Sequence, residues 1–224
     1  MAQDTSNILA PARGATYAKN SPAGVDTGLE VNNHGDLLMA EALPPRTELA
    51  RMGCMWTCSI PTASAFTYVA AWPTTRAEIV LYNPAAAGGV SLVITSAWLY
   101  GITSMAAAQP MTLIGQLVPV VATVPADNAA VLARSRNGKR NYNGIAIRAI
   151  ANTTAGQTTN LWDVLATSLV PAPTTNLGAA VFADLYGGYV VPPQGVFALN
   201  AVAGTAAGTA IIGVTWAEVL LTLG

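Results

Sequence analysis

The sequence predicts an all-β fold: a jelly-roll-like antiparallel β-sandwich preceded by an extended N-terminal arm. Beyond Leu49, short runs rich in Val, Ile, Phe, Tyr and Trp alternate with turn-forming clusters of Gly, Pro, Asn and Thr. Only SMAAAQP and ADNAAVLAR have the composition of a helical turn. No clean repeat is present, so a solenoid is not expected. Many short strands with regular turn signals are typical of a two-sheet sandwich or jelly roll.

Residues 1–48 differ from the rest of the chain, because they hold nine of its 21 charged residues and show little periodicity. This composition favours an arm rather than a core. Such a segment at a terminus is either a loose tail or lies on another surface. We expect it to pack across a neighbouring subunit, with the sandwich domain occupying residues 49–224.

The predicted strands follow one another along the sandwich domain. They are residues 51–60, 65–72, 76–83, 90–103, 111–124, 141–150, 160–169, 179–186, 189–191, 195–202 and 210–223. In the last run Ala210, Ile212, Val214 and Trp216 share one face, and the other face is small and uncharged. A strand of this kind is expected in the middle of a sheet, with neighbours on both sides.

Charged residues make up only 9 % of the chain and the formal net charge is −1. Nothing in this balance attracts nucleic acid or an anionic membrane. The surface is therefore expected to be covered with Thr, Asn, Gly and Ala, and in part by other protein copies. Gly, Pro, Asn or Gln interrupts every apolar run before about 20 residues, so no membrane-spanning helix is expected. We also expect no secretory signal at the start of the sequence.

Cys54 and Cys58 are the two cysteines. On a strand, residues four apart lie about 13 Å from each other, which is too far for a disulfide. A helix would let them meet, but the surrounding residues favour a strand. We interpret both as small buried hydrophobic residues.

Catalytic chemistry has few candidate residues, and we predict a protein that is not an enzyme and has no cofactor or metal site. The one histidine, His34, lies in the arm. No P-loop or GxGxxG pattern occurs, and two cysteines with one distant histidine are too few for zinc. A carboxylate pair for glycoside hydrolysis stays open among Asp127, Asp163 and Asp184. Each is more typical of a turn cap or an ion-pair partner.

Basic residues flank an Asn137-Gly138 pair, which is a strong hairpin signal. They form either a solvated hairpin tip or a basic knob that touches phosphate or an acidic neighbour. The candidate interface residues are His34, Arg134, Arg136, Lys139, Arg140, Trp216 and Glu218.

Tryptophan is a further candidate for contacts, because it serves in a core, at an interface or in a sugar-binding surface. The five tryptophans are Trp56, Trp72, Trp98, Trp162 and Trp216.

Four segments carry a resemblance to known proteins: GDLLMAEALPPRTELARMG, WPTTRAEIVLYNP, VPPQGVFAL and GVTWAEV. Across residues 35–224 the chain resembles structural proteins of tailed bacteriophages, in which a polar arm precedes a β-sandwich ending in a Trp-x-Glu strand. The resemblance implies that Trp216 and Glu218 close the last strand and that Pro192-Pro193 turn the chain before it. It implies no catalytic residues.

The same resemblance implies a virion component: a capsid decoration or cement protein, a head fibre or a tail piece. Such proteins are frequently trimeric, so the expected partners are copies of the chain and the major capsid protein or other virion proteins. The preferred expectation is a capsid decoration or cement protein. The alternatives are a receptor- or glycan-binding head-fibre or tail-spike protein, and a carbohydrate-active enzyme.

Overall fold

The structure is a computed structural model that describes residues 46–103, 108–121, 123–138, 142–153, 156, 161–170, 180–204 and 208–220. The chain divides into two units, Met1–Glu48 and Leu49–Gly224. The second unit is described below, together with the short helix α2 (Thr47–Arg51). The predicted arm lies outside the described residues up to residue 45. No helix in the described ranges has the length and apolarity needed to cross a bilayer.

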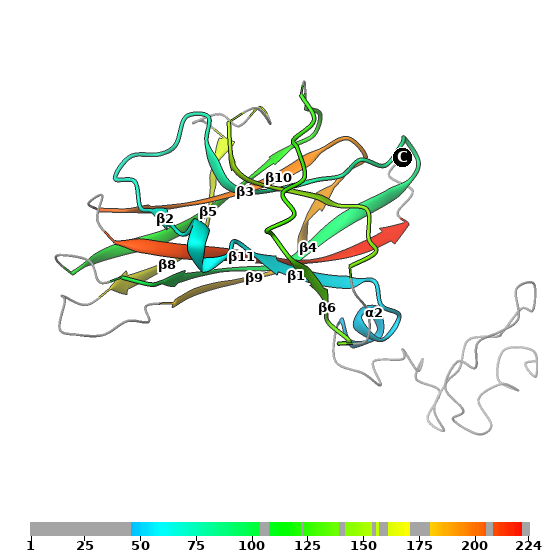
Figure 1. The fold of residues 1–224 in the computed structure, drawn as a ribbon, viewed down its shortest axis with the longest axis horizontal. Helices are drawn as coiled ribbons and strands as arrows, with labels where there is room; N and C mark the ends of the chain where they lie inside the picture. The colour runs from blue at the N-terminus through cyan, green and yellow to red at the C-terminus, as the bar shows by residue number, and fades with distance from the viewer. Residues whose placement is uncertain are drawn as a thin grey trace, which may run out of the picture. The chain divides into compact units, whose positions relative to one another are not determined.

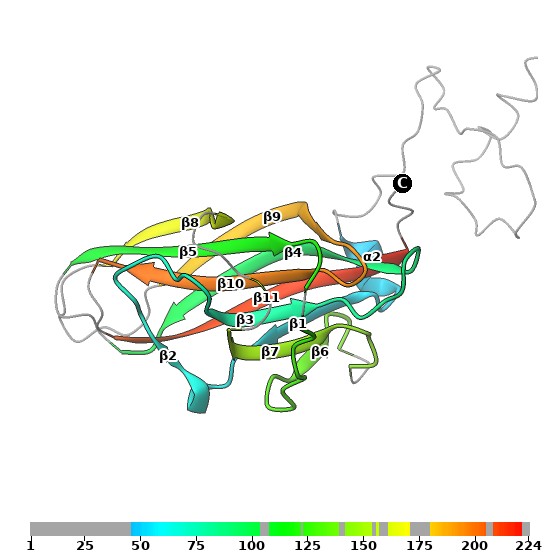
Figure 2. The same cartoon turned by 90° about the horizontal axis from the view of Figure 1, so that it is seen from above.

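Two antiparallel sheets form the second unit (Figures 1 and 2). The first sheet has the order β6-β1-β11-β4-β9, and the two-residue strand β2 (Phe66–Thr67) pairs with the beginning of β11. The second sheet has the order β7-β3-β10-β5-β8. The strands of the first sheet are β6 (Ala133–Ser135), β1 (Met55–Ser59), β11 (Thr209–Leu220), β4 (Val90–Gly101) and β9 (Ala180–Val191). Those of the second are β7 (Ile147–Asn152), β3 (Ala77–Tyr82), β10 (Val196–Ala203), β5 (Gln109–Val118) and β8 (Asp163–Val170).

The strand order is that of a jelly roll. Strand β1 pairs with β11, β3 with β10, β4 with β9 and β5 with β8, so the pairs are nested along the chain. Nested antiparallel pairing rolled into two facing sheets is the jelly-roll arrangement. The predicted fold class is therefore confirmed for the sandwich. Strands β6 and β7 extend the two sheets beyond β1 and β3.

The main core lies between the sheets. Strand β11 contributes Ala210, Ile212, Val214 and Trp216, which are all fully buried. Strands β1 and β4 flank it, as the apolar pattern predicted. The second sheet supplies the facing side chains, which include Ile79, Leu81, Leu113, Phe197 and Leu199.

A second apolar layer covers part of the outer face of the second sheet. Val80, Ala198, Ile114 and Trp162 belong to this cluster, which is separate from the main core. The Trp162 indole N–H donates a 2.9 Å hydrogen bond to the carbonyl of Pro73 in the β2–β3 connection. This bond holds the connection over the second sheet.

Asn83 joins several chain segments at the end of β3 and is fully buried. Its amide nitrogen donates to the carbonyls of Val90 and Val191, at 2.8 Å and 3.1 Å. Its carbonyl oxygen accepts from the N–H of Ala85 at 3.1 Å. Since Val90 and Val191 belong to the first sheet and β3 to the second, one side chain ties the two sheets together.

One predicted turn is a bulge inside a continuous strand. The sequence predicts a break at Gly187, but β9 continues from Ala180 to Val191. Its pairing with β4 skips Leu185–Gly188, so these residues bulge out opposite Thr95. Tyr186 and Gly187 have positive φ values of 48° and 79°, which the bulge absorbs without ending the strand.

Two further local predictions are wrong. ADNAAVLAR forms no helical turn; its end enters strand β6. Asn137-Gly138 does turn the chain, and Gly138 has a φ of 68°. The flanking strands β6 and β7 nevertheless belong to different sheets, so the turn does not make a hairpin. The other predicted helical turn, SMAAAQP, lies largely outside the described residues.

Candidate functional site

The structure describes four of the seven predicted interface residues, and these four differ in their exposure. His34, Lys139 and Arg140 lie outside the described residues. Arg134 on β6 and Arg136 in the following turn are exposed. Trp216 has no exposed surface, so its side chain belongs to the core and offers nothing to a partner. Glu218 is half-buried and holds a polar cluster instead.

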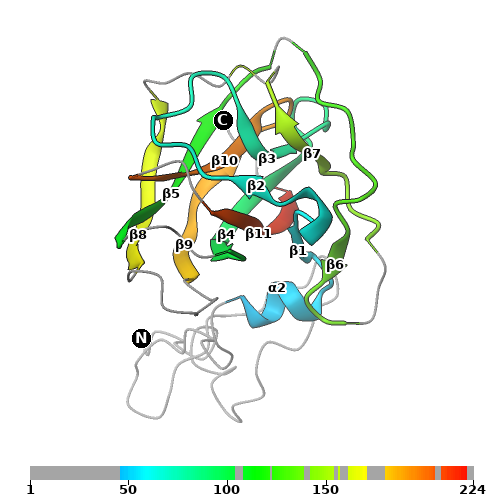
Figure 3. The same cartoon turned by 60° about the vertical axis from the view of Figure 1, so that its left-hand side comes forward.

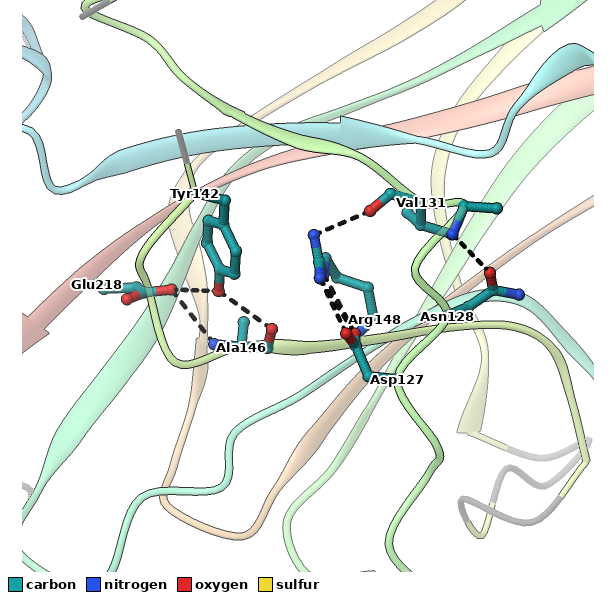
Figure 4. Close-up of polar contacts among 8 residues, drawn as sticks. Asp127, Asn128, Val131, Tyr142, Ala146, Arg148 and Glu218 are labelled. Carbon is teal, nitrogen blue, oxygen red and sulfur yellow. Dashed lines mark hydrogen bonds and ion pairs between the residues drawn. The ribbon is translucent and has the colours of Figure 1, made fainter. Parts of the chain in front are cut away.

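The carboxylate of Glu218 accepts hydrogen bonds from four donors. Figure 4 shows the bonds from Tyr142 and Ala146. Oε1 accepts from the Tyr142 hydroxyl at 2.9 Å, the Trp216 indole N–H at 3.1 Å and the Ala146 N–H at 3.4 Å. Oε2 accepts from the Ile145 N–H at 3.0 Å. Four hydrogen bonds to a partly buried carboxylate compensate for the water that it loses on burial, so no cation is needed beside it.

Glycine at position 144 makes this contact possible. A Cβ atom at Gly144 would collide with both carboxylate oxygens of Glu218. The backbone of the segment before β7 can therefore approach β11 closely only because this residue has no side chain.

Tyr142 connects the cluster to a second group of contacts. Its ring packs edge-on against Trp56, with centroids 4.8 Å apart, and the Arg148 guanidinium lies 4.7 Å from the ring centroid. Burial raises the pKa of Tyr142, and the charge of Glu218 adds to this effect. The hydroxyl therefore stays a hydrogen-bond donor throughout the neutral range.

Arg148 extends the network to the connection before β6. It forms an ion pair with Asp127 at 3.0 Å and donates to the carbonyl of Val131 at 2.9 Å (Figure 4). Residues 142–148 are thus tied to β11 at one end and to residues 127–131 at the other. The arrangement fastens the chain where it passes from the first sheet to the second.

Each of the three aspartates considered for glycoside hydrolysis has a hydrogen-bond or ion-pair partner. Asp127 pairs with Arg148, Asp163 accepts from the Tyr189 hydroxyl at 2.8 Å, and Asp184 accepts from the Tyr186 N–H at 3.2 Å. No hydrogen bond or ion pair joins any two of these three. Within the described ranges, no cluster of three His, Cys, Asp or Glu residues could hold a metal ion.

The tryptophans divide into core and surface residues. Trp56, Trp162 and Trp216 are buried. Trp98 is half-buried on the outer face of the first sheet, and Trp72 is 41 % exposed in the β2–β3 connection. Only the last two can therefore contact another molecule.

Large apolar side chains are exposed where β8 and β9 meet. These two strands form the edges of the two sheets on the same side of the sandwich (Figure 3). Val164 and Leu169 on β8, and Phe182 and Tyr186 on β9, are 57–82 % exposed. We call these four residues the β8–β9 surface. Phe182 pairs with Trp98 on the outer face of the first sheet, and Val164 pairs with Ile114 on the outer face of the second, so these residues flank the two edge strands and do not form one continuous patch. Exposed apolar groups on edge strands are typical of a contact with another protein.

Sequence reasoning missed most of these features. Nothing in the sequence links Tyr142 or Arg148 to Glu218, because the contacts depend on how the two sheets are connected. The apolar runs of β8 and β9 were visible, but their exposure depends on their places at the sheet edges.

Comparisons with known proteins add little to this description. No family model and no curated protein matches the chain. Among solved structures it is similar to a marine algae virus of the order Picornavirales, with 11 % identity over 93 % of this chain and 88 % of that chain and a TM-score of 0.22.

Two further solved structures are similar at the same level. The KBV activated particle at acidic pH has 12 % identity over 94 % of this chain and 87 % of that chain, with a TM-score of 0.24. Cocksfoot mottle virus has 14 % identity over 74 % and 94 %, with a TM-score of 0.22. At these TM-scores the likeness carries no argument. The jelly-roll assignment rests on strand order, and the resemblance to tailed-bacteriophage proteins stays an expectation.

Proposed function

We propose that the chain is a non-enzymatic structural subunit of a virion, which assembles with copies of itself through the β8–β9 surface. The observation that carries this proposal is the exposure of Val164, Leu169, Phe182 and Tyr186 on two adjacent edge strands. Covering these side chains in an assembly removes apolar surface from water, at about 25 cal/mol per Å².

The low charge of the chain supports the same proposal. An open edge strand offers unpaired backbone groups, and soluble monomers commonly protect such edges with charged side chains. Along the described parts of β8 and β9, the charged residues are Asp163 and Asp184. Contact with another copy of the chain would cover these sheet edges, which few charged side chains protect. An oligomer with closed symmetry would also leave no free interface at which further copies could add.

The finer role that we propose is capsid decoration or cementing, as a homo-oligomer such as a trimer. A protein that binds only the assembled shell stabilises it by mass action, in proportion to the occupancy of its sites. In this proposal the arm, residues 1–48, grips a neighbouring subunit. The jelly roll alone does not decide the role, because lectin domains and cupins share this fold.

The test places a charge on the proposed interface. Leu169→Glu is compared with Val120→Glu, which changes a residue of nearly equal exposure, 69 % against 71 %, outside β8 and β9. Sedimentation velocity of the full chain should show oligomers for the native protein and for Val120→Glu, and a smaller species for Leu169→Glu. Equal masses for the two variants would contradict the assignment of the surface.

The role of the arm requires a separate experiment. A variant lacking residues 1–40 should keep the β-rich circular dichroism spectrum of the native chain but lose the larger species in sedimentation. If the shortened chain assembles as the native chain does, the arm has no part in assembly.

A further inference from the structure

A hollow of about 310 Å³ opens on the outer face of the first sheet. Trp98 of β4 borders it on one side, and Leu132 and Arg134 border it on the other. Thr57 and Ser59 of β1 also line it. The hollow shares no residue with the β8–β9 surface or with the Glu218 cluster, although Phe182 of β9 stands beside Trp98 in the β4–β9 register.

The strand register explains the shape of the hollow. Ser59, Gly213 and Trp98 stand side by side on β1, β11 and β4. A Cβ atom at Gly213 would collide with the Trp98 indole, so the ring lies over the backbone of β11. Because Gly213 has no side chain, the Trp98 ring occupies the space above this residue and forms one border of the hollow.

Three side chains that line the hollow carry hydrogen-bond donors without partners in the described part of the chain. Across the described residues, the Arg134 guanidinium, the Ser59 hydroxyl and the Trp98 indole N–H have no hydrogen-bond or ion-pair partner. Arg134 sits beside Thr57 in the β1–β6 register, which places the guanidinium at the rim of the hollow. Leu132 adds an apolar wall and is 65 % exposed.

We propose that this hollow binds a saccharide that carries a carboxylate. The indole platform suits the apolar C–H face of a sugar ring, while the N–H and hydroxyl groups suit its oxygens. Arginine is the side chain best suited to hold a carboxylate, since its planar fork donates two parallel hydrogen bonds. The volume is at the lower end of the range for small-ligand sites, which fits one sugar unit.

The proposal assigns the saccharide to residues outside the β8–β9 surface, although Phe182 of that surface stands next to Trp98. It predicts that binding selects acidic saccharides over neutral ones of the same ring structure. An apolar peptide would use Trp98 and Leu132 but would gain nothing from Arg134. A matched pair of sugars therefore separates these possibilities.

The experiment titrates the full chain with sialyllactose and with lactose, and follows tryptophan fluorescence and saturation-transfer NMR. Sialyllactose should bind at least tenfold more tightly than lactose. Trp98→Ala should weaken sialyllactose binding at least tenfold, and Arg134→Gln should reduce it to the level of lactose. Trp72→Ala, which alters the exposed tryptophan away from the hollow, should leave binding unchanged.

Two results overturn the proposal. One is the absence of binding to any acidic saccharide, which is checked by adding oligogalacturonate to the series. The other is binding that Arg134→Gln leaves unchanged. Because Arg134 is exposed and has no partner in the described ranges, this variant tests the site even if Trp98→Ala does not fold. Circular dichroism of every variant checks the fold.

Discussion

Tyr142 and Glu218 stand 76 positions apart in the chain, and the Tyr142 hydroxyl donates a 2.9 Å hydrogen bond to the Glu218 carboxylate. The bond fastens the segment before β7 to the last strand of the first sheet. Because Glu218 also accepts from Trp216, Ile145 and Ala146, the loss of its carboxylate leaves four donors without this acceptor.

Glu218→Ala is expected to lower the free energy of unfolding by about 2–4 kcal/mol, since buried donors that lose their acceptor cost about 1–3 kcal/mol each. Tyr142→Phe removes the hydroxyl that reaches both the Glu218 carboxylate and the Ala146 carbonyl, and should cost about 1 kcal/mol. Urea unfolding measures both. In a double-mutant cycle the two changes should cost less together than their sum, and strict additivity would mean that the bond contributes nothing.

Gly144→Ala is expected to destabilise the protein by about 1–3 kcal/mol, because the new methyl group collides with the Glu218 carboxylate. Gly89 is not a suitable control, since a Cβ there also meets backbone atoms. The better control is Gly144→Ala in a Glu218→Ala background, where the collision is removed. If the glycine substitution costs the same in both backgrounds, the close approach is not what requires glycine.

Asn83→Ala is expected to lower the free energy of unfolding by about 2–4 kcal/mol, because it leaves the carbonyls of Val90 and Val191 without their donor in a fully buried site. Asn83→Asp should be no better, since a carboxylate cannot donate. The half-buried Asn128, whose side chain accepts from the Ala130 N–H, provides the comparison as Asn128→Ala. Thermal unfolding should rank Asn128→Ala well above both Asn83 variants in stability.

Cys58 is expected to make stability depend on pH in the alkaline range. Burial raises its pKa from 9.0 to about 12. The folded state therefore holds the thiol proton more tightly than the unfolded chain, so this contribution to stability is complete below pH 9 and is lost between pH 9 and about 12. Buried tyrosines with raised pKa values, among them Tyr68, steepen the same decline.

Comparison with Cys58→Ala isolates the contribution of the thiol. The variant should lose stability less steeply than the native chain between pH 9 and 12 in urea unfolding. Identical slopes would mean that the thiol titrates alike in both states. At pH 8, iodoacetamide should modify the half-buried Cys54 and should reach Cys58 only after unfolding.

Local pattern predicted the strands better than it predicted their connections. The central position of β11 was predicted from its bulky apolar face and its small, uncharged second face. Most other strands coincide with apolar runs that are bounded by turn residues. Strand β6 was missed, because three residues at the end of an alanine-rich segment carry no strand signal of their own. Gly187 was interpreted as a break, although a bulge accommodates positive φ values within a continuous strand.

The candidate sites were less predictable. Trp216 was expected at an interface, but an apolar residue on a central strand faces the other sheet and is buried. The hollow beside Trp98 depends on Ser59, Gly213 and Trp98 lying in one row, and that row exists only once β1, β11 and β4 are paired. The alignment of these three residues depends on how the strands pair across the whole sheet, so it cannot be predicted from any short stretch of sequence.

Assembly through the β8–β9 surface is the central claim, and sedimentation equilibrium of the full native chain tests it most directly. Over a range of micromolar concentrations, the account predicts a mass that is a whole multiple of 22.9 kDa greater than one. It also predicts that Leu169→Glu lowers this mass. A native chain that stays at 22.9 kDa throughout the range would contradict the account.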